Sequence, residues 1–179
     1  MRHDLSLAQC LFDRQAIDAV LDAQASLLNQ RYSASHPLVL CVMTGALVYA
    51  GHLLPRLSFQ LDLDYVHASR YGDARHGSQL DWIVRPRADV AHREVLLLDD
   101  ILDEGVTLHE IQQWLYAEGA TQVEIAVLTH KQKPLPQPCA PDYPALKTPD
   151  QYVYGFGLDV DGLWRNADGI FLAPMGTEG

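Results

Sequence analysis

An apolar run that ends abruptly in acidic residues, within residues 95–108 (VLLLDDILDEGVTL), constrains the fold of this chain more than any other feature. Residues 95–98 are short and unbroken in their apolar character, as expected for a strand buried on both faces of a parallel sheet. Asp99 and Asp100 follow directly, and open α/β sheets bind their ligands at the carboxyl ends of such strands. The segment therefore predicts a ligand site at one edge of a parallel sheet.

A glycine turn and a helix start come next. Gly105 permits backbone conformations that are closed to other residues, and Thr107 brings a hydroxyl to the start of a periodic apolar segment, which continues with Leu108, Ile111 and Leu115. The first N–H groups of a helix have no partner inside the helix and can hold a phosphate. The segment thus places an anion-binding helix start beside the acids.

Three aspartates, Asp99, Asp100 and Asp103, fall within five positions of this segment. Taken singly, each is equally well explained as a turn former or a helix cap. Together they repel one another, and a fold usually tolerates such a group only where a cation or sugar hydroxyls are shared among its members. The group therefore indicates a shared ligand.

Strands and helices alternate along the rest of the chain, which predicts an α/β fold with a mainly parallel central sheet flanked by helices. We expect helices after Asp13, with Ile17, Val20, Leu21 and Leu28 on one face, at 46–54 before Pro55, and at 108–118 before Gly119. We expect strands at 38–43, 59–66, 79–84 and 123–128, with 152–156 and 170–172 closing the sheet. The proline-rich residues 131–149 predict an irregular crossing, and the polar residues 69–78 predict either a plain hairpin loop or a mobile lid.

Composition limits the remaining classes. The 179 residues contain no linker or repeat and suit a single domain over residues 1–179. The 13 basic and 23 acidic residues give a net charge of −10, which argues against broad binding to nucleic acid or anionic membranes. No segment has the apolar length of a signal peptide or a membrane span, so we expect a cytoplasmic protein. Three scattered cysteines predict neither a disulfide framework nor a zinc site.

Residues 95–108 resemble the signature of the type I phosphoribosyltransferases, in which a strand delivers two acids to ribose hydroxyls and the next loop wraps a 5′-phosphate. Three further stretches carry the resemblance in the family's order: CVMTGALVYAGHLL at 41–54, LDLDYVHASRYG at 61–72 and DQYVYGFGLDVDGLWRN at 150–166. The last stretch points to the 6-oxopurine members, the hypoxanthine-guanine phosphoribosyltransferases. The resemblance implies the type I fold, with a small hood over the base site built from the C-terminal stretch and the N-terminal region.

The resemblance also implies an activity. The expected reaction is the magnesium-dependent transfer of the 5-phosphoribosyl group from phosphoribosyl pyrophosphate to hypoxanthine or guanine, which gives IMP or GMP and pyrophosphate in purine salvage. Its oxocarbenium-like transition state requires a neutralised leaving group, a base held in line and the exclusion of water. In this acidic chain the phosphate sites must be local, which favours magnesium as the cofactor. A homodimer or homotetramer is a further implication of the family.

Site roles follow from the resemblance residue by residue. Asp103 matches the general base near N7 of the purine. Asp99 and Asp100 match the acids that face the ribose hydroxyls, directly or through magnesium. The other matches are Glu104, Gly105, Val106 and Thr107 for the 5′-phosphate, Lys131, Tyr152 and Val153 for the purine, Thr44, Gly45 and Arg165 for pyrophosphate, Asp159 for a second magnesium, and Ser69, Arg70 and Tyr71 for the lid. Without the resemblance, Lys131 would be explained as a surface lysine, and Tyr152 and Val153 as strand residues.

Three residues depart from the family pattern and bear on the affinity for phosphoribosyl pyrophosphate. Glu104 stands where threonine or serine is common, and its charge would repel phosphate unless it points outward or toward a cation. Thr44 stands where a basic residue is frequent, and Val106 lacks a charge sometimes found at its position. None of these changes removes the expected base.

Other functions remain open at this stage. One is a relative that prefers xanthine, because the choice among hypoxanthine, guanine and xanthine depends on pocket shape. Another is a non-catalytic regulator that keeps the fold as a sensor of phosphoribosyl ligands, although the presence of Asp103, Lys131 and Arg165 argues against it. A third is an acidic-pocket signalling receiver, in which Asp99 and Asp100 would bind magnesium. That reading leaves residues 150–166 unexplained.

Overall fold

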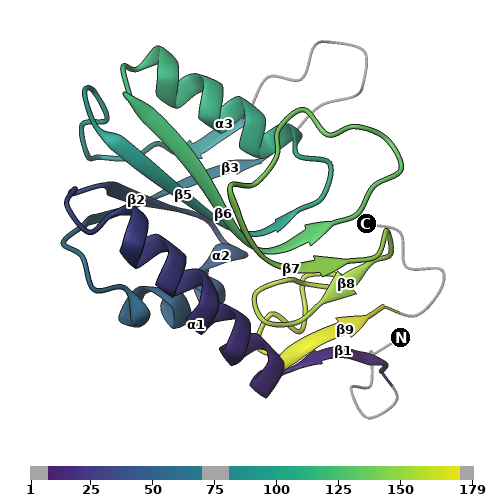
Figure 1. The fold of residues 1–179 in the computed structure, drawn as a ribbon. Coiled ribbons are helices and arrows are strands. Elements are labelled where there is room, and N and C mark those ends of the chain that lie inside the picture. The colour runs from purple at the N-terminus through teal and green to yellow at the C-terminus, as the bar shows by residue number, and fades with distance from the viewer. Residues whose placement is uncertain (1–7, 70–80, 174–179) are drawn as a thin grey trace.

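A six-stranded sheet forms the centre of the molecule in the computed structural model, which describes residues 8–69 and 81–173 (Figure 1). The strand order is β4-β3-β2-β5-β6-β7, and every pair is parallel except β3 with β4. The strands are β2 (Leu38–Val42), β3 (Asp62–Ser69), β4 (Asp81–Val84), β5 (Glu94–Leu102), β6 (Gln122–Lys131) and β7 (Tyr143–Thr148). The expected α/β class with a mainly parallel sheet is confirmed, while a single domain over residues 1–179 stays a prediction.

Helices cover both faces of this sheet, as Figure 1 shows. The helix α1 (Arg14–Arg31) and the helix α2 (Ala46–Leu53), which runs into a 3₁₀ turn at Leu54–Arg56, lie on one face, and α3 (Val106–Ala117) lies on the other. Strand β2 is buried along its whole length because alternate side chains enter the two apolar cores. None of the described helices is both long and apolar enough to span a membrane.

The expected boundaries are mostly right. The Asp13 carboxylate accepts the backbone N–H of Ala16 at 2.9 Å and caps α1 as expected. The strand expected at 59–66 lies three residues later, at Asp62–Ser69, because Phe59 turns inward against Tyr32, with ring centroids 5.2 Å apart. The antiparallel partner expected at 79–84 is β4, whose described residues begin at Asp81.

The strands expected at 152–156 and 170–172 do not close the central sheet, so this expectation is wrong. Strands β8 (Val153–Tyr154) and β9 (Gly169–Leu172) form a separate antiparallel sheet with β1 (Cys10–Asp13), in the order β1-β9-β8. Strand β8 ends after two residues because Gly155 and Phe156 take positive φ angles of 97° and 51° and turn the chain. This small sheet is the hood that the resemblance implies, joined from the two ends of the described chain (Figure 1).

The central sheet is instead completed by β7, which lies inside the segment expected to be irregular. Pro144 sits within this strand opposite Val127 of β6. Proline has no N–H to donate, and it is tolerated here because β7 is the edge strand of the sheet. Only the part between β6 and β7, at 132–142, has the irregular backbone that the prolines predict.

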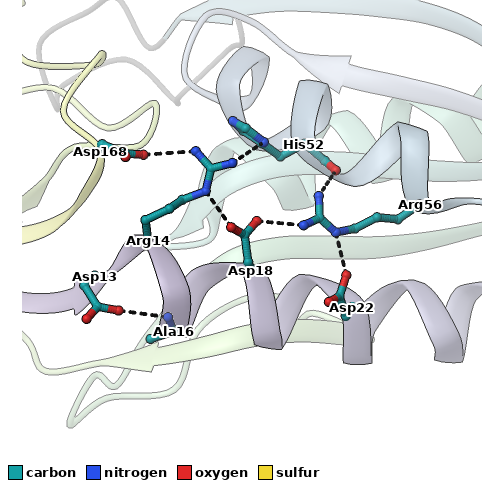
Figure 2. A network of polar contacts seen from close by, with 8 residues as sticks. All are labelled: Asp13, Arg14, Ala16, Asp18, Asp22, His52, Arg56 and Asp168. Atoms are coloured by element: carbon teal, nitrogen blue, oxygen red, sulfur yellow. Dashed lines mark hydrogen bonds and ion pairs between the residues drawn. The ribbon is translucent and has the colours of Figure 1, made fainter.

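Arg14 joins the hood to the helical layer, as Figure 2 shows. Its guanidinium contacts Asp168 beside β9 at 3.0 Å, Asp18 of α1 at 2.7 Å and the His52 ring nitrogen Nδ1 of α2 at 3.3 Å. The same guanidinium lies 5.8 Å from the centroid of the Phe156 ring, which packs on His52 at 4.9 Å between centroids. One side chain therefore holds three structural units in place.

Arg56 extends this network and fixes the position of His52 (Figure 2). It donates to the His52 carbonyl at 2.6 Å and pairs with Asp18 at 2.6 Å and Asp22 at 2.7 Å. Burial, followed by the charge of Arg14, lowers the pKa of His52 below its ordinary value. His52 is therefore held in the neutral form that can accept a hydrogen bond from Arg14.

Acidification should weaken this network through His52. Because the pKa of His52 is lower in the folded than in the unfolded chain, where it is about 6.5, the unfolded chain binds more protons as the pH falls through that value, and stability is lost. Urea unfolding at pH 7 and pH 5 should show a smaller loss of free energy of unfolding in His52→Gln than in the wild type. His92→Asn, at an exposed position, is the control. Equal losses in the wild type and His52→Gln would contradict the prediction.

Candidate active site

A cavity of about 320 Å³ opens at the carboxyl ends of β2, β5 and β6, and the hood forms its far wall. Most of the residues singled out from the sequence line it: Lys131, Tyr152 and Val153, Thr44, Gly45 and Arg165, and the acids Asp99, Asp100, Asp103 and Asp159. The structure thus brings together residues that lie up to about 120 positions apart in the chain. Their chemical roles stay predictions.

A second cavity, of about 270 Å³, shares Asp99, Asp100 and Asp103 with the first and continues to the start of α3. It is lined by residues 103–108, which include the expected 5′-phosphate loop. Gly105 precedes the helix with φ at 78°, in the left-handed region, and no side chain caps the helix. Thr107 is the second helical residue rather than a cap. The backbone N–H groups at this end are therefore available to an anion.

Asp99 and Asp100 form an acidic pair between the two cavities, in which Asp100 is buried and Asp99 partly buried. Strand β5 continues through them to Leu102, so both carboxylates project from a central strand. Asp99 Oδ1 accepts the backbone N–H of Asp100 at 2.9 Å, and Asp100 is only 8% exposed. Burial raises the pKa of Asp99, reinforced by the charge of Asp100, and burial also raises the pKa of Asp100 against the opposing charge of Arg165. The pair is an electrostatic cost that a cation or hydroxyl donors would remove.

The loop after β2 packs against this pair at Gly45. An added Cβ at Gly45 would lie 1.9 Å from Asp100 Oδ2, so only glycine fits beside the carboxylate. From the other side, a Cβ at Gly157 of the hood would lie 2.3 Å from the Gly45 carbonyl oxygen. The peptide bond that precedes this turn, Met43–Thr44, is cis. The loop is therefore held between the acids and the hood.

Asp103 forms ion pairs with two lysines. Its Oδ2 is paired with Lys131, the last residue of β6, and its Oδ1 lies 2.8 Å from Lys133 Nζ. Burial alone would raise the pKa of Asp103, but the contacts with Lys131 and Lys133 outweigh it and lower the pKa. Asp103 is therefore ionised at neutral pH. Lys131 is 6% exposed, so it is not the surface lysine that its sequence context alone would indicate.

Lys133 and Gln137 were not found by sequence reasoning. Gln137 donates to the carbonyl oxygens of Asp103 at 2.5 Å and Lys131 at 3.3 Å, and Cys139 donates to the Gly105 carbonyl at 3.3 Å. The irregular segment after β6 thus holds the loop after β5. The sequence did offer a signal for Lys133. It lies two positions after Lys131, and the side chains of residues i and i+2 of an extended chain lie on the same side.

The hood residues form a connected polar group. Asp159 Oδ1 pairs with Arg165 at 2.5 Å, and Asp159 Oδ2 accepts the Gly162 N–H at 2.8 Å. Arg165 also donates to the Gly157 carbonyl at 2.7 Å, and the Tyr152 hydroxyl donates to the Asp159 carbonyl at 3.0 Å. Both carboxylate oxygens of Asp159 therefore have protein partners, so a metal ion there would have to share them.

The outcome for the expected metal ligands and the expected lid residues differs from that for the other site residues. Within residues 8–69 and 81–173, no group of three or more His, Cys, Asp or Glu side chains is placed to hold a metal ion. A metal ion at Asp99 and Asp100 would therefore take further ligands from substrate or water. Ser69 ends β3, whereas Arg70 and Tyr71 lie outside the described residues, so the lid stays a prediction.

Comparison with known families identifies the class of protein that this fold and site define. A model of the phosphoribosyl transferase domain matches residues 10–161, so the chain belongs to the phosphoribosyl transferase domain family. Among curated proteins, it is 27% identical to the hypoxanthine-guanine phosphoribosyltransferase of Lactococcus lactis subsp. lactis over 164 residues, covering 91% of this chain and 89% of the relative. It is also 27% identical to the hypoxanthine-guanine-xanthine phosphoribosyltransferase of Tritrichomonas foetus over 163 residues, covering 89% of this chain and 88% of the relative.

Solved structures give the same fold. The hypoxanthine phosphoribosyltransferase of Staphylococcus aureus superposes with a TM-score of 0.88 at 24% identity, covering 96% of this chain and 94% of that one. The hypoxanthine phosphoribosyl transferase of Trypanosoma cruzi superposes with a TM-score of 0.88 at 21% identity, with the same two coverages, 96% and 94%. The type I phosphoribosyltransferase fold and the resemblance to the hypoxanthine-guanine members are confirmed.

The close approach of Gly45 to Asp100 gives a matched pair of glycine substitutions. Gly45→Ala should lower the free energy of unfolding by about 1–3 kcal/mol, the usual cost of overpacking, because its Cβ would overlap the carboxylate. Gly51→Ala in α2 should raise it by about 0.5–1 kcal/mol, because a Cβ there meets nothing within 4 Å and alanine favours the helix. Denaturant unfolding of the two variants is the measurement. A Gly45→Ala protein as stable as the wild type would contradict the packing described.

Proposed function

We propose that this protein transfers the 5-phosphoribosyl group from phosphoribosyl pyrophosphate to a 6-oxopurine, hypoxanthine or guanine, with magnesium as cofactor. The observation that carries the proposal is the pairing of Asp103 with Lys131 between the phosphate-loop cavity and the hood. That pairing sets a proton acceptor and a cationic donor side by side, as a base with an N–H and a neighbouring carbonyl requires. The names of the relatives, which specify hypoxanthine and guanine, support the choice of substrate.

The purine would lie between Lys131 and the hood. The Lys131 ammonium would donate to the 6-oxo group, the Tyr152 ring would stack on the base, and the Val153 backbone would meet its edge. If Lys131 turns from Asp103 to the base, Oδ2 of Asp103 loses this partner. Asp103 would therefore become a better proton acceptor as the base arrives, and it would take the proton from the purine near N7.

Phosphoribosyl pyrophosphate would span both cavities. Its 5′-phosphate would meet the backbone N–H groups of residues 104–107 and the Thr107 hydroxyl at the start of α3. Its ribose hydroxyls would face Asp99 and Asp100, and its pyrophosphate would meet Thr44, Gly45 and Arg165. Asp99 and Asp100 would also stabilise positive charge at the sugar in the transition state.

Magnesium fits the donor set of the site. Asp99 and Asp100 offer hard oxygen ligands, and burial raises the pKa of both, with the charge of Asp100 adding to the rise at Asp99, so a divalent cation would stabilise their ionised forms. Magnesium is commonly held by one or two carboxylates together with substrate phosphates, which matches an acidic pair without a third protein ligand. When bound, it would supply charge neutralisation of the leaving pyrophosphate. Asp159 would serve a second ion only by sharing its contacts with Arg165 and Gly162.

The direct test is nucleotide formation. The protein is incubated with phosphoribosyl pyrophosphate, magnesium and one base at a time from hypoxanthine, guanine, xanthine and adenine, with and without a chelator. IMP and GMP should form, and the chelator should abolish their formation. Faster formation of the xanthine nucleotide would support a xanthine-preferring enzyme, a choice raised by the name of the Tritrichomonas foetus relative. Binding without turnover would support a ligand-sensing regulator.

A homodimer or homotetramer and a cytoplasmic location remain expectations of the family.

Asp103→Asn tests the role of Asp103 as the general base. The substitution should slow turnover by roughly 10²–10⁴-fold, the usual span for general acid–base help, because an amide cannot accept the proton. Binding of phosphoribosyl pyrophosphate should be retained within a few-fold, since none of the proposed phosphate contacts comes from the Asp103 side chain. Steady-state rates and calorimetric binding separate the two effects, and Asp89→Asn, in the exposed turn before β5, is the control. Turnover equal to that of the wild type would remove Asp103 from this role.

Lys131→Ala tests whether Lys131 recognises the 6-oxo group of the purine. Loss of a charged donor should cost roughly 1.5–3 kcal/mol with hypoxanthine, about ten- to a hundred-fold in kcat/KM, because the 6-oxo group loses its partner. Adenine carries a donor at that position and should lose little or gain. The measurement is the ratio of kcat/KM for hypoxanthine and adenine in the wild type and the variant, with binding of phosphoribosyl pyrophosphate measured alongside. An unchanged ratio would show that Lys131 does not read the base.

A further inference from the structure

Lys133 lies at the centre of a group of carboxylates beside the phosphate loop. Its Nζ is 2.8 Å from Asp103 Oδ1, 3.0 Å from Glu104 Oε1 and 2.9 Å from Asp150 Oδ1. Its side chain is 19% exposed, whereas those of Asp103, Asp150 and Glu104 are 39%, 42% and 65% exposed, so solvent screens the contact with Glu104 the most. The contact with Asp103 Oδ1 is an ion pair rather than a well-directed hydrogen bond. Lys133 therefore acts as a local positive charge shared by three acids.

Lys133 halves the net negative charge of the ionised side chains around the loop. The three carboxylates carry −3, and Lys131 and Lys133 carry +2, which leaves −1. Without Lys133 the same group would carry −2. Glu104 lines the cavity where the 5′-phosphate would bind, so the added negative charge would oppose the phosphate at close range. The backbone N–H groups alone would have to overcome it.

The position of Lys133 is fixed by its own segment. Gln137 and Cys139, which follow Lys133, donate to the carbonyls of Asp103 and Gly105, and Lys131, which precedes it, pairs with the Asp103 carboxylate, so the chain on both sides of Lys133 is attached to the loop. Asp150, beyond β7, approaches the ammonium from another element. The ammonium is thus held from several directions, with the Glu104 carboxylate 3.0 Å from Nζ.

We propose that Lys133 is a positioning residue that lets this loop accept a phosphate dianion despite Glu104, and that it remains as the counter-ion of Asp103 when Lys131 turns to the base. The inference rests on the proposed function. In the first role, Lys133 draws the Glu104 carboxylate to itself and offsets its charge. In the second, its contact with Oδ1 keeps Asp103 oriented while Oδ2 is free to take the proton.

The two roles separate in a double-substitution experiment. Lys133→Met should raise the KM for phosphoribosyl pyrophosphate about tenfold or more, because Glu104 is left uncompensated, and should also lower kcat. Glu104→Gln alone should lower that KM, because it removes a negative charge from the cavity where the phosphate would bind. Combined with Lys133→Met, Glu104→Gln should return the KM to within about threefold of the wild type, since the repulsive charge is gone, while kcat stays low because Asp103 still lacks its counter-ion.

Controls separate charge from structure. Lys147→Met removes the same charge from an exposed position of β7 and should change neither constant. Lys133→Gln keeps a polar side chain without the charge, should behave as Lys133→Met does, and replaces it if Lys133→Met fails to fold. A double variant that binds phosphoribosyl pyrophosphate no better than Lys133→Met would overturn the first role. A kcat restored together with the KM would overturn the second.

Failure of the proposed function has a different signature. If the wild type forms no nucleotide, the wild type, Lys133→Met, Glu104→Gln and the double variant are titrated with ribose 5-phosphate by calorimetry. The affinity should fall in Lys133→Met and return in the double variant, since the charges of Lys133 and Glu104 act on the bound phosphate whether or not a reaction follows. Equal affinities in the wild type and Lys133→Met would overturn the inference whether or not the wild type is an enzyme.

Discussion

Two neighbouring carboxylates near the end of a central strand are the constraint on which this site depends. Asp99 and Asp100 lie near the carboxyl end of β5, between β2 and β6, where Asp100 is buried and Asp99 partly buried. Burial raises the pKa of both, and the charge of Asp100 raises that of Asp99 further. The neighbouring loop reaches them only because Gly45 has no side chain. The site is thus built in a state that ligand binding stabilises.

Positive charge around this pair is divided among three side chains with different partners. Lys131 and Lys133 neutralise Asp103, and Arg165 is held by Asp159 and by the Gly157 carbonyl on the hood. Each cation therefore has a protein partner before any substrate arrives. In the proposed function, a phosphate or a base would replace one of these partners, so that no cation is left without a partner at any step.

Sequence reasoning found the parts of the fold that local physics determines. The apolar run, the acids and the glycine turn predicted β5, its ligand edge and the start of α3, because each signal lies within a few residues of what it specifies. The resemblance implied the hood, but the pairing of β8 and β9 with β1 instead of with the central sheet was missed, as was β7, since two-residue and edge strands depend on distant partners. Lys133 and Gln137 were missed for the same reason, as their contacts with Asp103 join two loops.

The hood has a consequence for the order in which the molecule can be made. Strand β1 near the amino end pairs with β9 near the carboxyl end, and Arg14 bridges to Asp168 across 154 positions. The strands and helix that carry the phosphate loop emerge earlier from the ribosome and pair with near neighbours. The hood can close only after the chain has been synthesised through β9, at the entropic cost of a very long loop. A nascent chain can thus form the acidic pair and the cavity at the start of α3 before the hood completes the first cavity.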